Sequence, residues 1–132
     1  MATADCSVEI PLLVIVDDDA SMRISTQRLI RSFGFRANIF PSAQEFLESG
    51  CAHDTACLIL DLRMPSMNGL RLQRLLASRS YQIPTIFVTA HGNAQDEREA
   101  MKAGAVDFLR KPVSKETLLK AIQTALMHPT LR

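Results

Sequence analysis

The residues best suited to chemistry carry carboxylates, a hydroxyl and an ammonium group, and they are Asp17–Asp19, Asp61, Thr89 and Lys111. Carboxylates that crowd together raise one another's pKa unless a cation lies between them. Hard oxygen ligands of this kind suit Mg²⁺, which keeps bound waters and leaves room for a phosphate oxygen. A lysine would add a positive charge for a phosphoryl group, and a threonine hydroxyl would add a hydrogen bond. This chemistry requires residues far apart in the chain to come together.

Each residue also has an ordinary explanation when it is taken alone. A run of aspartates after a strand is commonly a helix N-cap or a solvated loop. Asp61 could form a turn, Thr89 could be a β-branched strand residue, and Lys111 could be a surface charge. The choice between these interpretations depends on the elements that position the residues.

Short apolar segments alternate with amphipathic segments along the chain. The apolar segments predict strands at Leu12–Val16, Ala37–Phe40, Cys57–Leu60, Thr85–Val88 and Val106–Leu109. The helical spacing of apolar residues, with cap residues such as Ser42, Gly34 and Ser114, predicts helices over about 22–33, 42–47, 70–76, 94–103 and 114–126. Strands that are apolar at every position need cover on both faces, as in parallel sheets.

The predicted fold is therefore α/β, with a single doubly wound, five-stranded parallel sheet of the flavodoxin-like type. A closed barrel would need eight units, and the expected strand order is 2-1-3-4-5. In that order the first and third strands are neighbours, and ligands bind at the carboxyl ends of the strands. Asp17 and Asp61 directly follow these two strands, Thr89 ends the fourth, and Lys111 follows the fifth. The topology predicts that all four lie at one edge of the sheet.

Composition limits the remaining classes of function. The 132 residues suit one domain, expected over 11–127, with an N-terminal tail over 1–10 and a C-terminal tail or truncated linker over 128–132. The formal charge of +1 and the lack of a basic run argue against direct nucleic acid binding. The three cysteines, Cys6, Cys51 and Cys57, suit a reducing cytoplasm rather than a disulfide framework. With no signal peptide and no membrane-length apolar run, we expect a soluble cytoplasmic protein.

Four motifs resemble those of the receiver domains of two-component response regulators, over about Leu12 to Leu126. They are Val14–Asp18, Leu58–Pro65 with Gly69, Phe87–Gly92 and Gly104–Pro112. Arg63–Met64–Pro65 and Thr89–Ala90–His91–Gly92 look most like the FixJ/LuxR-type branch, whose members usually carry a DNA-binding domain after the receiver. The resemblance implies that the output is either such a domain outside this chain or a separate downstream protein.

The resemblance also implies roles for individual residues. Asp61 would accept a phosphoryl group from the phosphohistidine of a sensor histidine kinase. Mg²⁺ (or Mn²⁺) would be bound by Asp18, Asp61 and the backbone carbonyl of Arg63, and by Asp17 through a water. Lys111 and Thr89 would bind phosphoryl oxygens, and Lys111–Pro112 resembles the family's cis peptide. Asp19 would begin the following helix.

The resemblance further implies a conformational switch as the output. Thr89 would move toward the phosphoryl group, Phe108 would turn inward, and the face made by helix 4, strand 5 and helix 5 would change and could form a homodimer. By the same resemblance, Arg63 and His91 would occupy positions that tune the lifetime of the phosphate. Phe108 could equally be a simple core aromatic, and His91 a loop residue without a role.

Two other classes of function remain as alternatives. A haloacid-dehalogenase-type phosphohydrolase also forms an aspartyl phosphate, and Asp17–Asp18–Asp19 partly matches its motif, but Asp61 would then be unexplained. A receiver-like interaction module that is never phosphorylated typically lacks an acidic ligand, the acceptor or the lysine, and this chain has all of them. We therefore expect a signalling switch with slow autodephosphorylation rather than a turnover enzyme.

Overall fold

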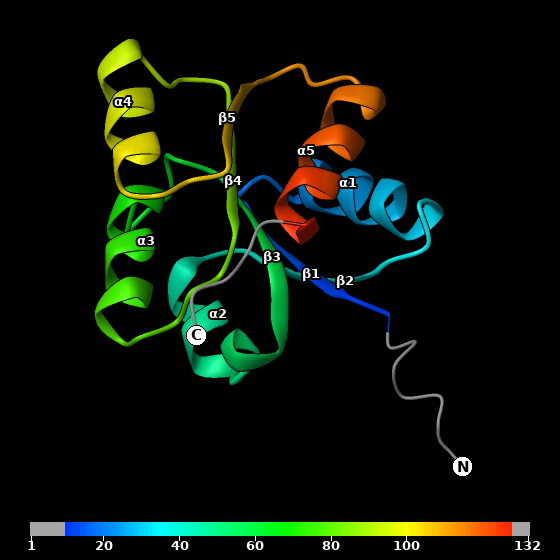
Figure 1. Ribbon diagram of the computed structural model, residues 1–132, viewed down its shortest axis with the longest axis horizontal. Coiled ribbons are helices and arrows are strands. Elements are labelled where there is room, and N and C mark those ends of the chain that lie inside the picture. Colours follow the sequence, from blue (N-terminus) through cyan, green and yellow to red (C-terminus); the bar gives the residue numbers. More distant parts are fainter. Residues whose placement is uncertain (1–9, 128–132) are drawn as a thin grey trace.

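The computed structural model describes residues 10–127 and contains one five-stranded parallel sheet in the order β2-β1-β3-β4-β5 (Figure 1). The strands are β1 (Leu12–Val16), β2 (Arg36–Phe40), β3 (Thr55–Leu60), β4 (Thr85–Thr89) and β5 (Asp107–Arg110). The helices are α1 (Ala20–Ser32), α2 (Ala43–Ser49), the 3-10 turn η2 (Ala52–Asp54), α3 (Gly69–Ser78), α4 (Ala94–Lys102) and α5 (Lys115–Met127). The predicted fold class and strand order are confirmed. Of the tails expected over 1–10 and 128–132, residues 1–9 (with Cys6) and 128–132 lie outside the described residues.

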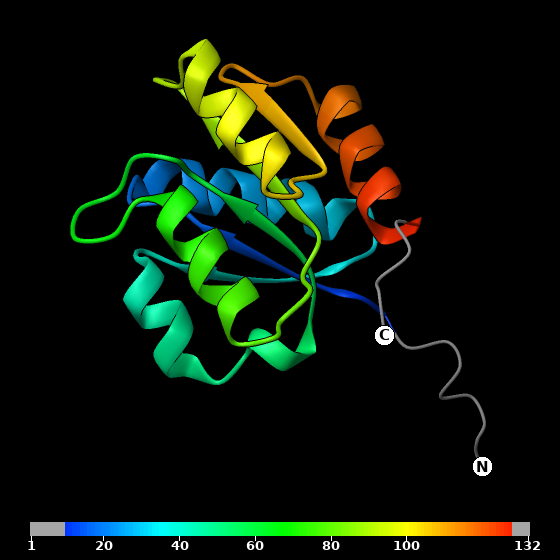
Figure 2. The same ribbon diagram turned by 60° about the vertical axis from the view of Figure 1, so that its left-hand side comes forward.

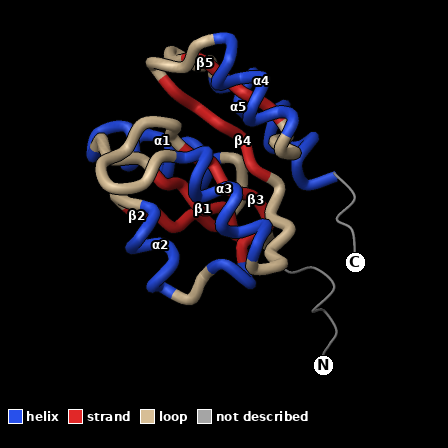
Figure 3. Tube along the Cα trace, turned by 90° about the vertical axis from the view of Figure 1, so that its left-hand side faces the viewer, coloured by secondary structure: helices blue, strands red, loops and turns tan. Residues whose placement is uncertain are grey.

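Helices cover both faces of the sheet, which explains why its central strands are apolar throughout. Alternate residues of β1 and β3, such as Val14 and Leu58, pack with α2, α3 and α4, whereas Leu13 and Ile59 pack with α1 and α5. Figure 2 shows α3 and α4 on the near side of the sheet with α1 behind it, and Figure 3 views the molecule from the side of α2 and α3. Among residues 10–127, no helix has the length and apolar character needed to cross a bilayer.

Side-chain caps define where several helices begin, largely as the sequence predicts. The Asp19 carboxylate accepts hydrogen bonds from the backbone N–H groups of Ser21 and Met22, which confirms that Asp19 begins α1. The Ser42 hydroxyl caps α2, and the Ser114 hydroxyl accepts from the N–H of Thr117 at the start of α5. Caps of this kind satisfy N–H groups that have no partner within the helix.

The element bounds differ from the predicted ones at a few ends. β3 begins two residues earlier than the predicted Cys57, at Thr55, because this polar but buried residue still pairs with Leu12 of β1. β5 is shifted by one residue to Asp107–Arg110, so it ends on a charged residue that hydrophobicity does not mark as strand. The short turn Ala52–Asp54 has no periodicity that could have predicted it.

Backbone hydrogen bonds carry the strand alignment into the loops that hold the candidate residues. The Asp61 N–H donates to the carbonyl of Val16 at 2.9 Å, and the Asp17 N–H donates to the carbonyl of Phe40 at 3.2 Å. At the ends of β4 and β5, the Lys111 N–H donates to the carbonyl of Thr89 at 2.9 Å. The sheet therefore fixes the backbone positions of Asp17, Asp61 and Lys111 independently of their side-chain contacts.

Gly69, the first residue of α3, lies directly against the loop that follows β3. A Cβ atom at this position would lie 2.5 Å from the carbonyl oxygen of Asp61 and 2.8 Å from the ring of Phe87. The Gly69 N–H also donates to the carbonyl of Leu62 at 2.8 Å, which closes the loop. A glycine is required here because the backbone of Asp61 and the side chain of Phe87 leave no room.

Gly69→Ala is expected to destabilise the protein by about 1–3 kcal/mol, because overpacking a rigid core forces neighbouring atoms to move. Urea denaturation followed by circular dichroism measures this loss. Arg71→Ala, an exposed position on the same helix, serves as the control and should change stability by less than about 0.5 kcal/mol. Equal stabilities for Gly69→Ala and the control would contradict the packing described for this glycine.

Candidate functional site

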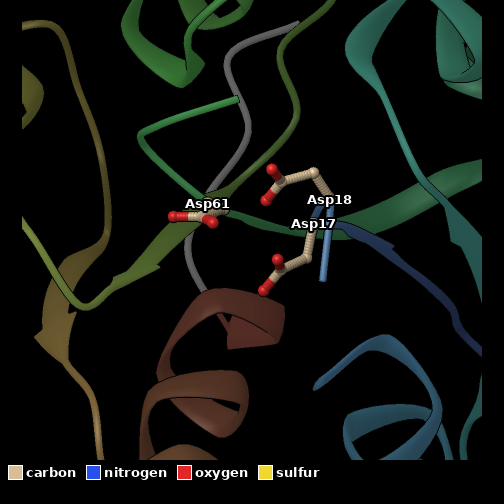
Figure 4. Close-up of side chains that lie close together, drawn as sticks. All are labelled: Asp17, Asp18 and Asp61. Carbon is tan, nitrogen blue, oxygen red and sulfur yellow. The ribbon is translucent and has the colours of Figure 1, made fainter. Parts of the chain in front are cut away.

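Three carboxylates meet at the carboxyl ends of β1 and β3. Ligand atoms of Asp17, Asp18 and Asp61 all lie within 4.8 Å of one another. In Figure 4, Asp17 and Asp18 leave the end of β1 side by side, and the Asp61 side chain faces them from the end of β3. Asp17 and Asp61 are buried, whereas Asp18 is exposed. The predicted convergence of these three residues is thus present in the structure.

The environment of Asp61 disfavours its charged form. Burial raises the pKa of the Asp61 carboxyl, and the neighbouring Asp17 carboxylate raises it further. The Lys111 ammonium, the Arg63 N–H and the Thr89 hydroxyl lower this pKa, but they do not outweigh the first two causes. The site therefore has a deficit of positive charge around Asp61.

The carboxylate oxygens of Asp17 have closer hydrogen-bond donors than those of Asp61. One Asp17 oxygen accepts the N–H of Asp19 at 3.0 Å, and the other accepts the ammonium of Lys111 at 2.9 Å. For Asp61, the Arg63 N–H lies 3.4 Å from one oxygen, and the Lys111 ammonium lies 3.9 Å from the other. Asp61 is thus the carboxylate with the weaker internal contacts.

This donor set fits a divalent cation such as Mg²⁺. Carboxylate oxygens are its preferred ligands, and burial together with the charge of Asp17 raises the pKa of Asp61 in spite of the nearby Lys111. A cation among Asp17, Asp18 and Asp61 would relieve the repulsion between them. The three residues are a subset of the predicted metal ligands, and the fourth, the Arg63 carbonyl, stays a prediction.

Thr89 and Lys111 border the acidic cluster from the other side. Thr89 is fully buried, its hydroxyl lowers the pKa of Asp61, and it accepts the N–H of His91 at 3.2 Å. The Lys111 side chain spans Asp17 and Asp61, and the Lys111–Pro112 peptide is cis, as expected. The sequence thus identified both residues that flank Asp61 with a hydroxyl and a positive charge.

Arg63 and His91 lie at the exposed rim of the site. The Arg63 guanidinium is 3.6 Å from a carboxylate oxygen of Asp96 and 3.5 Å from the carbonyl of His91. It therefore connects the loop after β3 with the loop after β4 and the first turn of α4. The side chain of His91 is exposed, and only its backbone takes part in these contacts.

Phe108 is buried on β5, with a relative exposure of 5%. Its ring centroid lies 5.9 Å from that of Phe87, and the Arg110 guanidinium lies 5.3 Å from the ring centroid on one face. Arg110 in turn contacts Glu97 of α4 at 2.9 Å. The ring therefore points inward and is linked through Arg110 to α4.

Sequence reasoning missed several residues that support the site. The Arg23 guanidinium donates to the carbonyl of Asp17 at 2.8 Å and so holds the loop after β1. Asp96 and Glu97 contact Arg63 and Arg110, as described above. Only Arg23 carried a signal, because it lies in the first turns of the helix that the aspartates begin. The other contacts join loops and strands whose spacing the sequence does not reveal.

A largely apolar groove adjoins the cluster between α1 and α5. Its volume is about 170 Å³. Met22 and Leu29 of α1 and Leu118 of α5 line it, together with Asp17 and Asp61. An apolar side chain of a partner could thus lie directly beside the carboxylates.

Comparisons with known proteins agree with this geometry. Residues 13–123 match the family described as response regulator receiver domain. The chain is 47% identical over 115 residues to response regulator protein TmoT of Ectopseudomonas mendocina, covering 87% of this chain and 52% of TmoT. It is 37% identical over 114 residues to transcriptional regulatory protein FixJ of Bradyrhizobium diazoefficiens, covering 86% of this chain and 56% of FixJ.

The fold also matches a solved structure. The crystal structure of FixJ-N superposes with a TM-score of 0.83 at 37% identity, over 95% of this chain and 100% of that one. The chain spans about half the length of the curated relatives it matches. These comparisons support the resemblance to the FixJ-type branch.

Asp61→Asn is expected to raise the free energy of unfolding at neutral pH when divalent cations are chelated. The pKa of Asp61 is higher in the folded than in the unfolded state, so its ionised carboxylate lowers stability at pH values above the folded pKa. This cost disappears as the pH falls through the folded pKa toward the ordinary value of 3.8. The advantage of Asp61→Asn should therefore shrink on acidification.

Urea denaturation in EDTA at several pH values measures this difference. Asp54→Asn is the control, because the Asp54 side chain is 69% exposed and should give no pH-dependent advantage. A less stable Asp61→Asn variant at neutral pH would refute the charge deficit inferred at this site.

Proposed function

This chain belongs to the response regulator receiver family of two-component signalling, and we propose that Asp61 is its phosphoacceptor. The observation that carries the proposal is the position of Asp61 in a cluster with two other carboxylates, Lys111 and Thr89. Asp61 is also the less engaged of the two buried aspartates, since both oxygens of Asp17 already accept close hydrogen bonds. This difference favours Asp61 over Asp17 as the nucleophile and argues against the phosphohydrolase alternative, which uses an aspartate after the first strand.

The proposed reaction transfers a phosphoryl group from phosphohistidine to Asp61. A carboxylate oxygen of Asp61 attacks phosphorus, the P–N bond breaks, and the imidazole nitrogen keeps the electron pair. The product is an acyl phosphate on Asp61. Bound Mg²⁺, or Mn²⁺, held by Asp17, Asp18, Asp61 and the Arg63 carbonyl, would neutralise negative charge on the phosphoryl oxygens.

The residues of the chain supply the remaining electrostatic stabilisation. Lys111 lies 3.9 Å from Asp61, so its ammonium can move from Asp17 to a phosphoryl oxygen. The Thr89 hydroxyl, already beside Asp61, can donate to another. Phosphoryl transfer depends mostly on such alignment and charge stabilisation. Arg63 and His91 border the exposed side, where water must approach, and we assign them to the control of slow autodephosphorylation.

The groove between α1 and α5 supports a sensor histidine kinase as the phosphodonor. Its apolar lining, from Met22, Leu29 and Leu118, suits apolar side chains of a partner helix. The groove adjoins Asp61, so a helix bound there could present its phosphohistidine to the acceptor. This interaction belongs in the cytoplasm.

The output that we propose is a change in the face formed by α4, β5 and α5. Thr89 and Phe108 connect this face to Asp61, and Arg110 and Glu97 extend the connection to α4. The changed face would bind a second copy of the chain, a downstream protein or a DNA-binding domain outside residues 11–127. The segments 1–10 and 128–132 would be tails or linkers to such parts, and the chain itself would not contact nucleic acid.

Wild-type protein is expected to gain one phosphoryl group when incubated with Mg²⁺ and acetyl phosphate, because Asp61 lines the groove beside the carboxylate cluster and its oxygens have only long contacts to Arg63 and Lys111. Intact-mass spectrometry measures the product. Asp61→Asn should gain none, and neither should the wild type in EDTA. Equal labelling of Asp61→Asn would exclude Asp61 as the acceptor, and turnover of an added small phosphate ester would favour a phosphohydrolase.

Lys111→Ala is expected to slow this phosphorylation by about 10²-fold or more, because a preorganised charge beside the reacting oxygens is lost. The exposed Lys115, at the start of α5, provides the matched control, and Lys115→Ala should react at the wild-type rate. Rates are measured from the time course of the mass shift. Similar rates for the two lysine variants would remove Lys111 from the proposed site.

A further inference from the structure

Gly92, in the loop between β4 and α4, lies where the interior has no room for a side chain. A Cβ atom at this position would overlap with Cζ of Phe108, and it would lie 2.7 Å from Cε1 of the same ring and 2.9 Å from Cγ2 of Thr89. These are two of the residues through which the site communicates with α4. The space at position 92 is therefore taken up by the ring of Phe108 and the methyl group of Thr89.

Backbone conformation does not explain this glycine. The positive φ angles within residues 10–127 belong to Ser66, Ser80, Gly34, Gly50 and Gly104, and Gly92 is not among them. An alanine could adopt the backbone conformation of Gly92 without strain. The reason for a glycine here is therefore the neighbouring side chains, which leave no space for a Cβ atom.

The ring of Phe108 has a buried neighbour on its interior side and a half-exposed neighbour on one face. Toward the interior, the ring contacts Phe87, which is fully buried. On a ring face lies Arg110, which is half exposed and held by Glu97 of α4. Close-packed interiors do not accommodate extra atoms without rearrangement. A side chain at position 92 would therefore displace the ring of Phe108 toward solvent and disturb its contact with Arg110.

We propose that Gly92 is a positioning residue that admits the ring of Phe108 to the interior beside Thr89. It has no contact with the carboxylate cluster and acts only through the space that it leaves open. A larger residue would separate phosphorylation from its output, because Asp61 would still be modified while Phe108 remained outside. This inference rests on the proposed function for its consequence in signalling, whereas the position of the ring can be tested independently.

The experiment compares wild-type protein with Gly92→Ala by NMR, without a phosphodonor. Nuclear Overhauser cross-peaks between the rings of Phe108 and Phe87 report the inward position, and the substitution introduces no new signal that overlaps them. We expect these cross-peaks in the wild type and their loss in Gly92→Ala. Cross-peaks of equal intensity in both proteins, or their absence from the wild type, would overturn the proposal.

A double-mutant cycle with Phe108→Leu separates the ring contact from a general effect on the loop. Leucine lacks the two ring atoms that a Cβ at position 92 would meet. Gly92→Ala should lower the folding equilibrium constant about tenfold in the wild type and by less than about threefold in Phe108→Leu. Equal losses in both backgrounds, including failure of both to fold, would contradict the steric explanation.

Intact-mass measurement then tests the consequence for signalling. Gly92→Ala should still gain one phosphoryl group from acetyl phosphate, whereas its Phe108–Phe87 cross-peaks should stay absent after phosphorylation. Recovery of the cross-peaks would overturn the proposal that Gly92→Ala separates phosphorylation of Asp61 from the inward movement of the Phe108 ring. If the wild type gains no phosphoryl group, the proposed function fails, but the ring measurement without phosphodonor still decides the role of Gly92.

Discussion

The repulsion between Asp17 and Asp61 is the constraint on which the rest of the structure depends. The sheet holds the backbone of both residues by hydrogen bonds to the neighbouring strands, and their carboxylates lie close together at its edge. A single ammonium group, from Lys111, spans both. This arrangement makes the site suited to a divalent cation.

The surroundings of this cluster connect the carboxylates with the packing around Phe108. Thr89 lies beside Asp61 on one side and beside Gly92 and Phe108 on the other. Phe108 is in turn linked through Arg110 to α4. In a close-packed interior, a displacement of Thr89 would change the space open to the ring, which is the basis of the switch proposed above. Ligands can shift such an equilibrium only through contacts that differ between its two states.

The sequence allowed prediction of the fold and of most of the cluster, since both follow from periodicity. Apolar strands such as Leu12–Val16 require two covered faces, and parallel strands place the residues after them at one edge. The early start of β3 at Thr55 could not be predicted, because polar residues there pair only through the tertiary fold. The roles of Gly92 and Asp96 were also missed, since they depend on distances between loops that no spacing in the sequence encodes.

The two-sided covering of the sheet has a consequence for how copies of this molecule can associate. Within residues 10–127, β2 and β5 are the two edge strands of the sheet, and they are five and four residues long. β2 begins with Arg36, β5 ends with Arg110, and Pro112, which has no N–H to donate, follows shortly after. Short edge strands with charged residues discourage the addition of a strand from another chain. Contacts between copies would therefore be favoured on helical surfaces rather than through extension of the sheet.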